Sequence, residues 1–239
     1  MTADTSAQNC LEGKTIICFG DSLCAGKTVE KYSEEYGFGW AGLIGEKNGM
    51  EWRNYGKNGA VITYIEGHDR LVSQQFEIAV REFDKVDYIL FEGGCNDADQ
   101  LGNYPESFGE ISSGFDNFDC STFTGAFENL ILQIVTAYPD AKIGYIIPPK
   151  MGEAPYESEK NIRRQYYDRA IEVCEKWGIP YLDLWNENPM NPELPIFYDA
   201  DIPKEEAAEA GMFYTDGQHL TLRGYQRIIS QIEAFIRSL

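Results

Sequence analysis

Five residues in four separate motifs of the chain are of the types that acyl transfer requires. Ser22 in "FGDSL" is a candidate nucleophile, and His219 in "DGQH" is the candidate base that would take its proton. Asp216, three residues before His219, can reach the imidazole across a tight turn and fix its tautomer. Gly59 in "GKNG" and Asn96 in "GGCND" would supply, together with the backbone of Ser22, the N–H groups that hold an oxyanion.

These residues follow or precede segments with strand and helix patterns in alternation. Short apolar runs predict strands over 14–19, 50–56, 86–94, 141–149 and 179–185, and helical spacing predicts helices over 39–49, 68–83, 121–139, 158–178 and 220–239. Alternation of this kind indicates βαβ units and a parallel sheet. We therefore expect an α/β fold, a flavodoxin-like three-layer α/β/α sandwich with about five parallel strands. The candidate residues would then share the rim at the carboxyl ends of the strands.

Each candidate also has an ordinary structural interpretation when it is considered alone. Ser22 could cap a helix, His219 could be a surface or cap residue, and Asn96 could stabilise a turn. The combination favours catalysis, because nucleophile, base, base-orienting carboxylate and oxyanion donors all fall at one predicted rim. The other histidine, His68, begins a predicted helix and is expected to be structural or to lie at the rim.

Two further residues near Ser22 need a role. Cys24 is a rival nucleophile, but a catalytic thiolate needs an electropositive and partly exposed setting, and a residue two positions on from Ser22 tends to point elsewhere. Asp21 is expected to brace the loop by accepting backbone N–H bonds.

Three other stretches resemble known binding motifs but lack the spacing or the structural context that those motifs require. A phosphate-binding loop needs G-x-x-x-x-G-K-[ST], and here Gly26 arrives one residue late, with the acidic Asp21 inside the loop. "GFGWAG" at 37–42 does not follow a strand, as a dinucleotide fingerprint must. "DNFDCS" at 116–121 lacks the ligands of a calcium loop. We expect no metal and no cofactor.

Composition restricts the class of protein further. The chain has 239 residues, of which 43% are hydrophobic, so we expect a single domain over 1–239, with residues 1–13 as a flexible N-terminal arm. A net charge of −19 disfavours nucleic acid and anionic lipid as partners. The sequence contains no apolar run long enough to span a membrane, its first residues do not resemble a signal peptide, and its six cysteines are scattered. We therefore expect a cytoplasmic protein with reduced thiols. Secretion of a longer precursor stays open.

The sequence resembles the SGNH hydrolases, also called the GDSL esterase/lipase family. "FGDSL", "GKNG", "GGCND" and "DGQH" occur in the family's order and extend over almost the whole chain. The resemblance implies a three-layer α/β/α fold and hydrolysis of an ester by a serine nucleophile. It also implies a Ser22–His219–Asp216 triad and an oxyanion hole made by Ser22, Gly59 and Asn96.

The substrate is less well defined. Segments 97–120 and 185–215 combine aromatic with short polar residues, a composition that suits a sugar or another polar substrate, although they could equally be packing excursions. We expect a small-molecule or carbohydrate ester with a small, acetyl-type acyl group. The alternatives are a lysophospholipase or thioesterase for longer acyl chains, an O-acyltransferase with the same triad, and a non-catalytic glycan-binding module. The sequence does not predict the oligomeric state.

Overall fold

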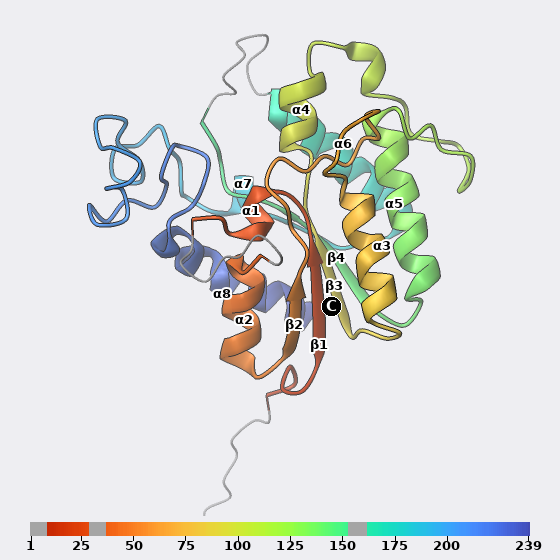
Figure 1. The fold of residues 1–239 in the computed structure, drawn as a ribbon, viewed down its shortest axis with the longest axis horizontal. Coiled ribbons are helices and arrows are strands. Elements are labelled where there is room, and N and C mark those ends of the chain that lie inside the picture. Colours follow the sequence, from red (N-terminus) through yellow and green to blue (C-terminus); the bar gives the residue numbers. More distant parts are fainter. Residues whose placement is uncertain (1–8, 29–36, 153–161) are drawn as a thin grey trace, which may run out of the picture.

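Strands and helices alternate along the chain as the sequence predicts (Figure 1). The computed structural model describes residues 9–28, 37–152 and 162–239. The strands are β1 (Thr15–Phe19), β2 (Glu51–Asn54), β3 (Tyr88–Phe91), β4 (Lys142–Ile147) and β5 (Tyr181–Asp183). The helices are α1 (Ser22–Ala25), α2 (Gly39–Asn48), α3 (Val72–Glu82), α4 (Cys95–Leu101), α5 (Phe123–Ala137), α6 (Ile162–Trp177), α7 (Leu184–Glu187) and α8 (Leu222–Ser238), with a 3₁₀ turn η1 at Pro105–Ser107.

The strands form one parallel sheet in the order β2-β1-β3-β4-β5. The chain moves from β1 outward to β2 and then returns to the other side of β1 to form β3, so the strand order reverses between β1 and β3. Phe19, the last residue of β1, pairs with Phe91, the last residue of β3. The segments that follow these two strands therefore start side by side, at the position where ligands bind in open α/β sheets.

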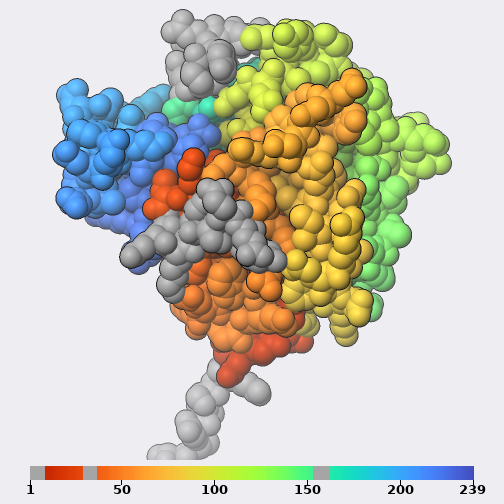
Figure 2. Space-filling model, viewed as in Figure 1, coloured from red at the N-terminus to blue at the C-terminus, as the bar shows by residue number. Residues whose placement is uncertain are grey.

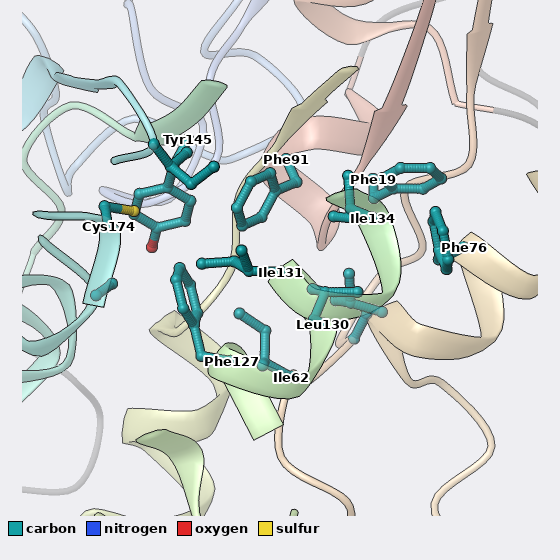
Figure 3. Packing of buried hydrophobic residues seen from close by; sticks show 14 of the residues in the cluster. Phe19, Ile62, Phe76, Phe91, Phe127, Leu130, Ile131, Ile134, Tyr145 and Cys174 are labelled. Carbon is teal, nitrogen blue, oxygen red and sulfur yellow. The ribbon is translucent and has the colours of Figure 1, made fainter. Parts of the chain in front are cut away.

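Alternate residues of the strands face two separate hydrophobic clusters, since successive side chains of a strand point to opposite faces. Ile17 and Phe19 pack with α3, α5 and α6, whereas Ile16 and Cys18 pack with α2 and α8. Figure 3 shows the first cluster, where Phe19, Phe91 and Tyr145 from the sheet meet side chains of the helices. Helices thus cover both faces of the sheet, and the expected three-layer α/β/α sandwich is confirmed (Figure 1).

Helix α8 connects the last part of the chain to the first turn after β1. Thr221 caps the helix by accepting the N–H of Gly224 at 3.2 Å. Four residues later, the buried hydroxyl of Tyr225 donates to the carbonyl of Leu23 in α1 at 2.8 Å. The segment before α8 is therefore held next to the carboxyl end of β1.

The observed elements differ from the expected ones mainly at their ends. Helix α3 begins at Val72 instead of 68, and the segment 97–120, expected as a long loop, begins inside α4 and contains η1. The first residues of the expected helix 158–178 lie outside the described residues, as do residues 1–8 of the expected flexible arm. The described end of that arm is packed, because Leu11 is fully buried and the N–H of Gly13 donates to the Gly49 carbonyl. Among the described helices, none is long and apolar enough to cross a membrane.

Candidate active site

The turn after β1 holds Ser22 at the N-terminus of the short helix α1. Asp21 precedes it as the N-cap, and its carboxylate accepts the N–H of Leu23 at 2.8 Å. Gly26, with φ of 70°, ends the helix and donates its N–H to the Ser22 carbonyl. Sequence reasoning missed α1, because four residues are too few to show helical periodicity.

Gly20 allows the chain to turn sharply between β1 and α1. Its φ is 155°, and a Cβ built there would lie 2.5 Å from Oε1 of Glu92, so no other residue fits without displacement. The side-chain amide of Gln75 on α3 accepts the Gly20 N–H and donates to the Gly20 carbonyl, both at 2.9 Å. The buried Gln75 side chain thus binds both backbone polar groups of Gly20, two residues before Ser22.

The Ser22, His219 and Asp216 side chains form a continuous chain of hydrogen bonds. Nε2 of His219 lies 2.9 Å from Oγ of Ser22, and its Nδ1 lies 2.9 Å from Oδ2 of Asp216. The turn itself is tightened by Asp216, whose Oδ1 accepts the backbone N–H groups of His219 at 2.8 Å and Gln218 at 3.2 Å. This geometry is that of a nucleophile, a base and a base-orienting carboxylate.

Asp216 has a second partner besides His219, which the sequence did not indicate. The ammonium of Lys204, in the segment 185–215, forms an ion pair with Oδ2 of Asp216. Partial burial would raise the pKa of the Asp216 carboxyl, but hydrogen bonds from His219 and Lys204 outweigh it and hold that pKa well below its usual value. These two partners therefore favour the ionised form of Asp216.

Two backbone N–H groups, those of Ser22 and Gly59, are candidates for an oxyanion hole. Within the described parts of the chain, the N–H groups of Ser22 and Gly59 donate to no acceptor. Gly59 has φ of 72°, which favours glycine, and lies in the turn that follows β2. Because no described residue accepts them, both N–H groups stay candidates for binding a substrate oxygen.

Asn96 has a different environment from the one expected. Its amide nitrogen donates to Oδ2 of Asp21 at 3.1 Å and to the carbonyl of Ala60 at 3.0 Å, so both of its hydrogens already have partners. The side chain links the turn after β1 to the turn after β2. It lies where the sequence placed it, but it reaches a substrate only by exchanging one of these partners.

Asp97 fixes the same turn from the other side. Its buried carboxylate accepts the N–H groups of Ile62 and Thr63 and the hydroxyl of Thr63, at 2.6 to 3.1 Å. Asn96 and Asp97 are adjacent at the start of α4, so one helix turn binds the chain at residues 60, 62 and 63, just after Gly59.

The sequence matches the GDSL-like Lipase/Acylhydrolase family over residues 18–227. The chain belongs to this family. Its fold is similar to that of an aryl esterase from M. smegmatis, which has 16% identity and a TM-score of 0.63, with 95% of this chain and all of that one covered. A Lactobacillus plantarum protein gives 19% identity and a TM-score of 0.71 over 95% and 98% of the two chains. A carbohydrate acetylesterase from Sinorhizobium meliloti gives 15% identity and a TM-score of 0.60 over 94% and 99%. No curated protein matched the sequence.

The family assignment confirms the resemblance to SGNH hydrolases.

The other residues that the sequence offered as candidates have structural roles. Cys24 is buried, and its thiol donates to Asn54. Burial raises the pKa of that thiol well above its usual value, so it is a poor nucleophile. His68 lies before α3, where its Nδ1 accepts the N–H of Arg70. In "DNFDCS", Asp119 accepts the N–H and hydroxyl of Ser121 and holds the turn that leads into α5.

Arg163 is a further residue that the sequence did not single out. It is 3% exposed and makes a two-point contact with Asp99 on α4, with an N–O distance of 2.6 Å. The same guanidinium donates to the carbonyl of Gly152 and to the side chain of Gln218. Arg163 thus connects α4, the segment after β4 and the turn that carries His219.

The segments 97–120 and 185–215 lie on the two sides of the turn after β1. Figure 2 shows the blue residues around 200 and the yellow-green residues around 100 flanking the red-orange residues that follow β1. The later segment is anchored by the buried Tyr214, whose hydroxyl donates to the carbonyl of Lys150. Among the described residues, no group of three or more potential metal ligands occurs.

Proposed function

We propose that the protein is a serine esterase that hydrolyses esters of small acyl groups at Ser22. The observation that carries this proposal is the hydrogen-bonded chain from Ser22 Oγ through His219 to Asp216. Membership of a lipase and acylhydrolase family agrees with it. Ser22 is buried, with 5% exposure, and the side chain of His219 is 23% exposed, so the pair meets solvent through the imidazole.

The arrangement supports a two-step reaction. Ser22 Oγ attacks the ester carbonyl while His219 Nε2 takes its proton, and the imidazolium then gives that proton to the departing alcohol. Water attacks the acyl-enzyme with the help of the same imidazole, which releases the carboxylic acid and restores Ser22. Asp216 holds the imidazole in the required tautomer and stabilises its charged form.

The carbonyl oxygen becomes negative in both tetrahedral intermediates. The N–H groups of Ser22 and Gly59 would bind this oxygen, because neither donates a hydrogen bond to another described residue. Asn96 joins them when one of its amide hydrogens turns from Asp21 or from Ala60 toward the substrate. Each such donor contributes about 100- to 1,000-fold in rate.

We assign a carbohydrate ester as the preferred substrate class, with an acetyl-type acyl group. Polar and aromatic residues dominate both segments that flank the site, and exposed aromatic faces such as that of Tyr104 suit sugar rings. One protein of similar fold is described as a carbohydrate acetylesterase and another as an aryl esterase.

A chain-length series of aryl esters tests the acyl preference. We expect kcat/KM to be largest for acetyl to butyryl esters and to fall for longer chains. A steady increase from acetyl to decanoyl would favour a lysophospholipase or thioesterase instead. Acetylated sugars in the same panel test the alcohol part.

Substituting the nucleophile tests the activity itself. In Ser22→Ala, hydrolysis of every ester in the panel should fall to the background rate, whereas unchanged hydrolysis would refute the triad and leave a glycan-binding module as the better explanation. Product analysis with a competing sugar acceptor separates hydrolysis from O-acyl transfer, because a transferase would yield the acylated sugar in preference to the free acid.

A further inference from the structure

Glu92 lies directly behind the turn that carries Ser22, although no step of the reaction uses it. It follows β3 and is 1% exposed. Its Oε1 accepts two backbone N–H groups, that of Asp21 at 2.7 Å and that of Cys24 at 3.1 Å. Ser22 lies between these donors in the sequence, so one carboxyl oxygen holds the backbone on both sides of the nucleophile.

The fit between Glu92 and this turn is close. A Cβ at position 20 would lie only 2.5 Å from Oε1 of Glu92, so the carboxyl fits because residue 20 is a glycine. Gln75 fixes the same glycine through its N–H and its carbonyl. Any shift of the Glu92 carboxyl would therefore be transmitted to the peptide groups on either side of Ser22.

A second contact extends from Glu92 toward Asn96. Asp21, whose backbone N–H is bound by Glu92 Oε1, accepts an amide hydrogen of Asn96 at its Oδ2, at 3.1 Å. Oε2 of Glu92 has no hydrogen-bond partner among the described residues, and Glu92 lines a small cavity whose other lining residues are mainly apolar, Leu23 and Pro148 among them. Burial raises the pKa of Glu92 well above its usual value, which favours the neutral carboxyl.

We propose that Glu92 is a positioning residue for ester hydrolysis, which holds the Ser22 backbone through its Oε1 and orients Asn96 through Asp21. The inference rests on the proposed function at Ser22. It goes beyond the triad and the oxyanion hole, because Glu92 touches neither the substrate nor the reacting atoms. The backbone N–H of Ser22 is itself an oxyanion donor, so a small displacement of this turn affects both nucleophile and oxyanion hole.

A carboxyl oxygen supplies an acceptor here that an apolar residue lacks. Without Oε1, the N–H groups of Asp21 and Cys24 lose their acceptor in a buried site, and the turn would shift to find others. A shift of Asp21 would also move the Oδ2 that accepts from Asn96. Glutamine retains the acceptor, since its side-chain carbonyl can take the place of Oε1.

The test compares Glu92→Gln and Glu92→Leu with the wild type on one small aryl acetate. A fluorophosphonate titration gives the concentration of reactive sites, so that kcat is expressed per active site and is independent of the folded fraction. Glu128→Leu and Glu128→Gln are matched controls, because Glu128 is a fully buried carboxyl that contacts Ser112, Lys176 and Trp177. Ser22→Ala is measured in the same assay.

We expect Glu92→Leu to lower kcat per active site by about 10- to 100-fold with little change in KM. Glu92→Gln should retain most of the wild-type kcat, and the Glu128 variants should lower the melting temperature while leaving kcat per active site unchanged. The proposal is overturned if Glu92→Leu lowers only the melting temperature, or if Glu92→Gln loses as much kcat as Glu92→Leu. Should Glu92→Leu fail to fold, a large loss of kcat in Glu92→Gln still refutes it. Full activity in Ser22→Ala would refute the proposed function instead, which keeps the two failures distinct.

Discussion

At the residue scale, Ser22 is held in position by contacts with residues from distant parts of the chain. Its Oγ faces His219, its flanking N–H groups bind Glu92, and the preceding glycine binds Gln75. The triad and oxyanion candidates were predictable because their motifs are local. Lys204, Arg163 and Glu92 were not, because their importance comes from contacts with residues that are remote in the sequence, and a lone lysine, arginine or glutamate has no local signature.

The role of Asp216 can be tested with Asp216→Asn, which keeps the shape of the side chain. We expect kcat to fall by about 10⁴-fold, because the amide no longer fixes the productive tautomer of His219. The measurement is kcat on an aryl acetate, with the melting temperature as a control for folding. A loss smaller than about tenfold would show that Asp216 does not orient the base.

The buried carboxyl of Glu92 predicts a pH dependence of stability. Its pKa is raised well above 4.5 by burial, so the folded protein retains a proton that the unfolded chain releases once the pH exceeds 4.5. Stability contributed by this group is therefore lost as pH rises from 4.5 toward the folded pKa. Glutamine cannot ionise, so Glu92→Gln does not lose this stability. The melting temperature of the variant minus that of the wild type should therefore be larger at pH 8 than at pH 4.5. A difference that is constant over this range would contradict a neutral Glu92.

At the element scale, the adjacency of β1 and β3 brings the site together. The short helices that follow these strands, α1 and α4, contain Ser22 and Asn96, and the contact of α8 with α1 brings His219 to them. Apolar runs and helical spacing were enough to predict the order of the elements. They did not predict α1 and α4, because helices of four and seven residues show too little periodicity, and the start of α3 was misplaced because residues 68–71 are held by turn and bridge contacts.

The turn between β1 and α1 can be tested through its glycine. In Gly20→Ala, the new Cβ would clash with Glu92 at a backbone angle that alanine rarely adopts, so we expect the free energy of unfolding to fall by about 3 kcal/mol. Gly178→Ala is the matched control, since Gly178 has φ of 66° and open space around it, and strain alone should cost about 1–2 kcal/mol. Chemical denaturation measures both. Equal losses would show that contact with Glu92 does not restrict Gly20.

At the scale of the whole molecule, the net charge of −19 makes us expect a negative potential around the site. We expect kcat/KM for an anionic aryl ester to increase when ionic strength rises from about 10 mM to about 150 mM, because the Debye length shortens from about 30 to about 8 Å. A neutral ester of the same acyl group serves as the control and should change little. Equal responses of the two esters would mean that the field at the site differs from that of the whole molecule.

The central claim is that Ser22 is the nucleophile, and covalent labelling tests it most directly. After reaction of the wild-type protein with a fluorophosphonate, peptide mass spectrometry should locate the adduct on Ser22, and His219→Ala should label far more slowly because the serine has lost its base. An adduct on another residue, or equal labelling of Ser22→Ala, would contradict the account.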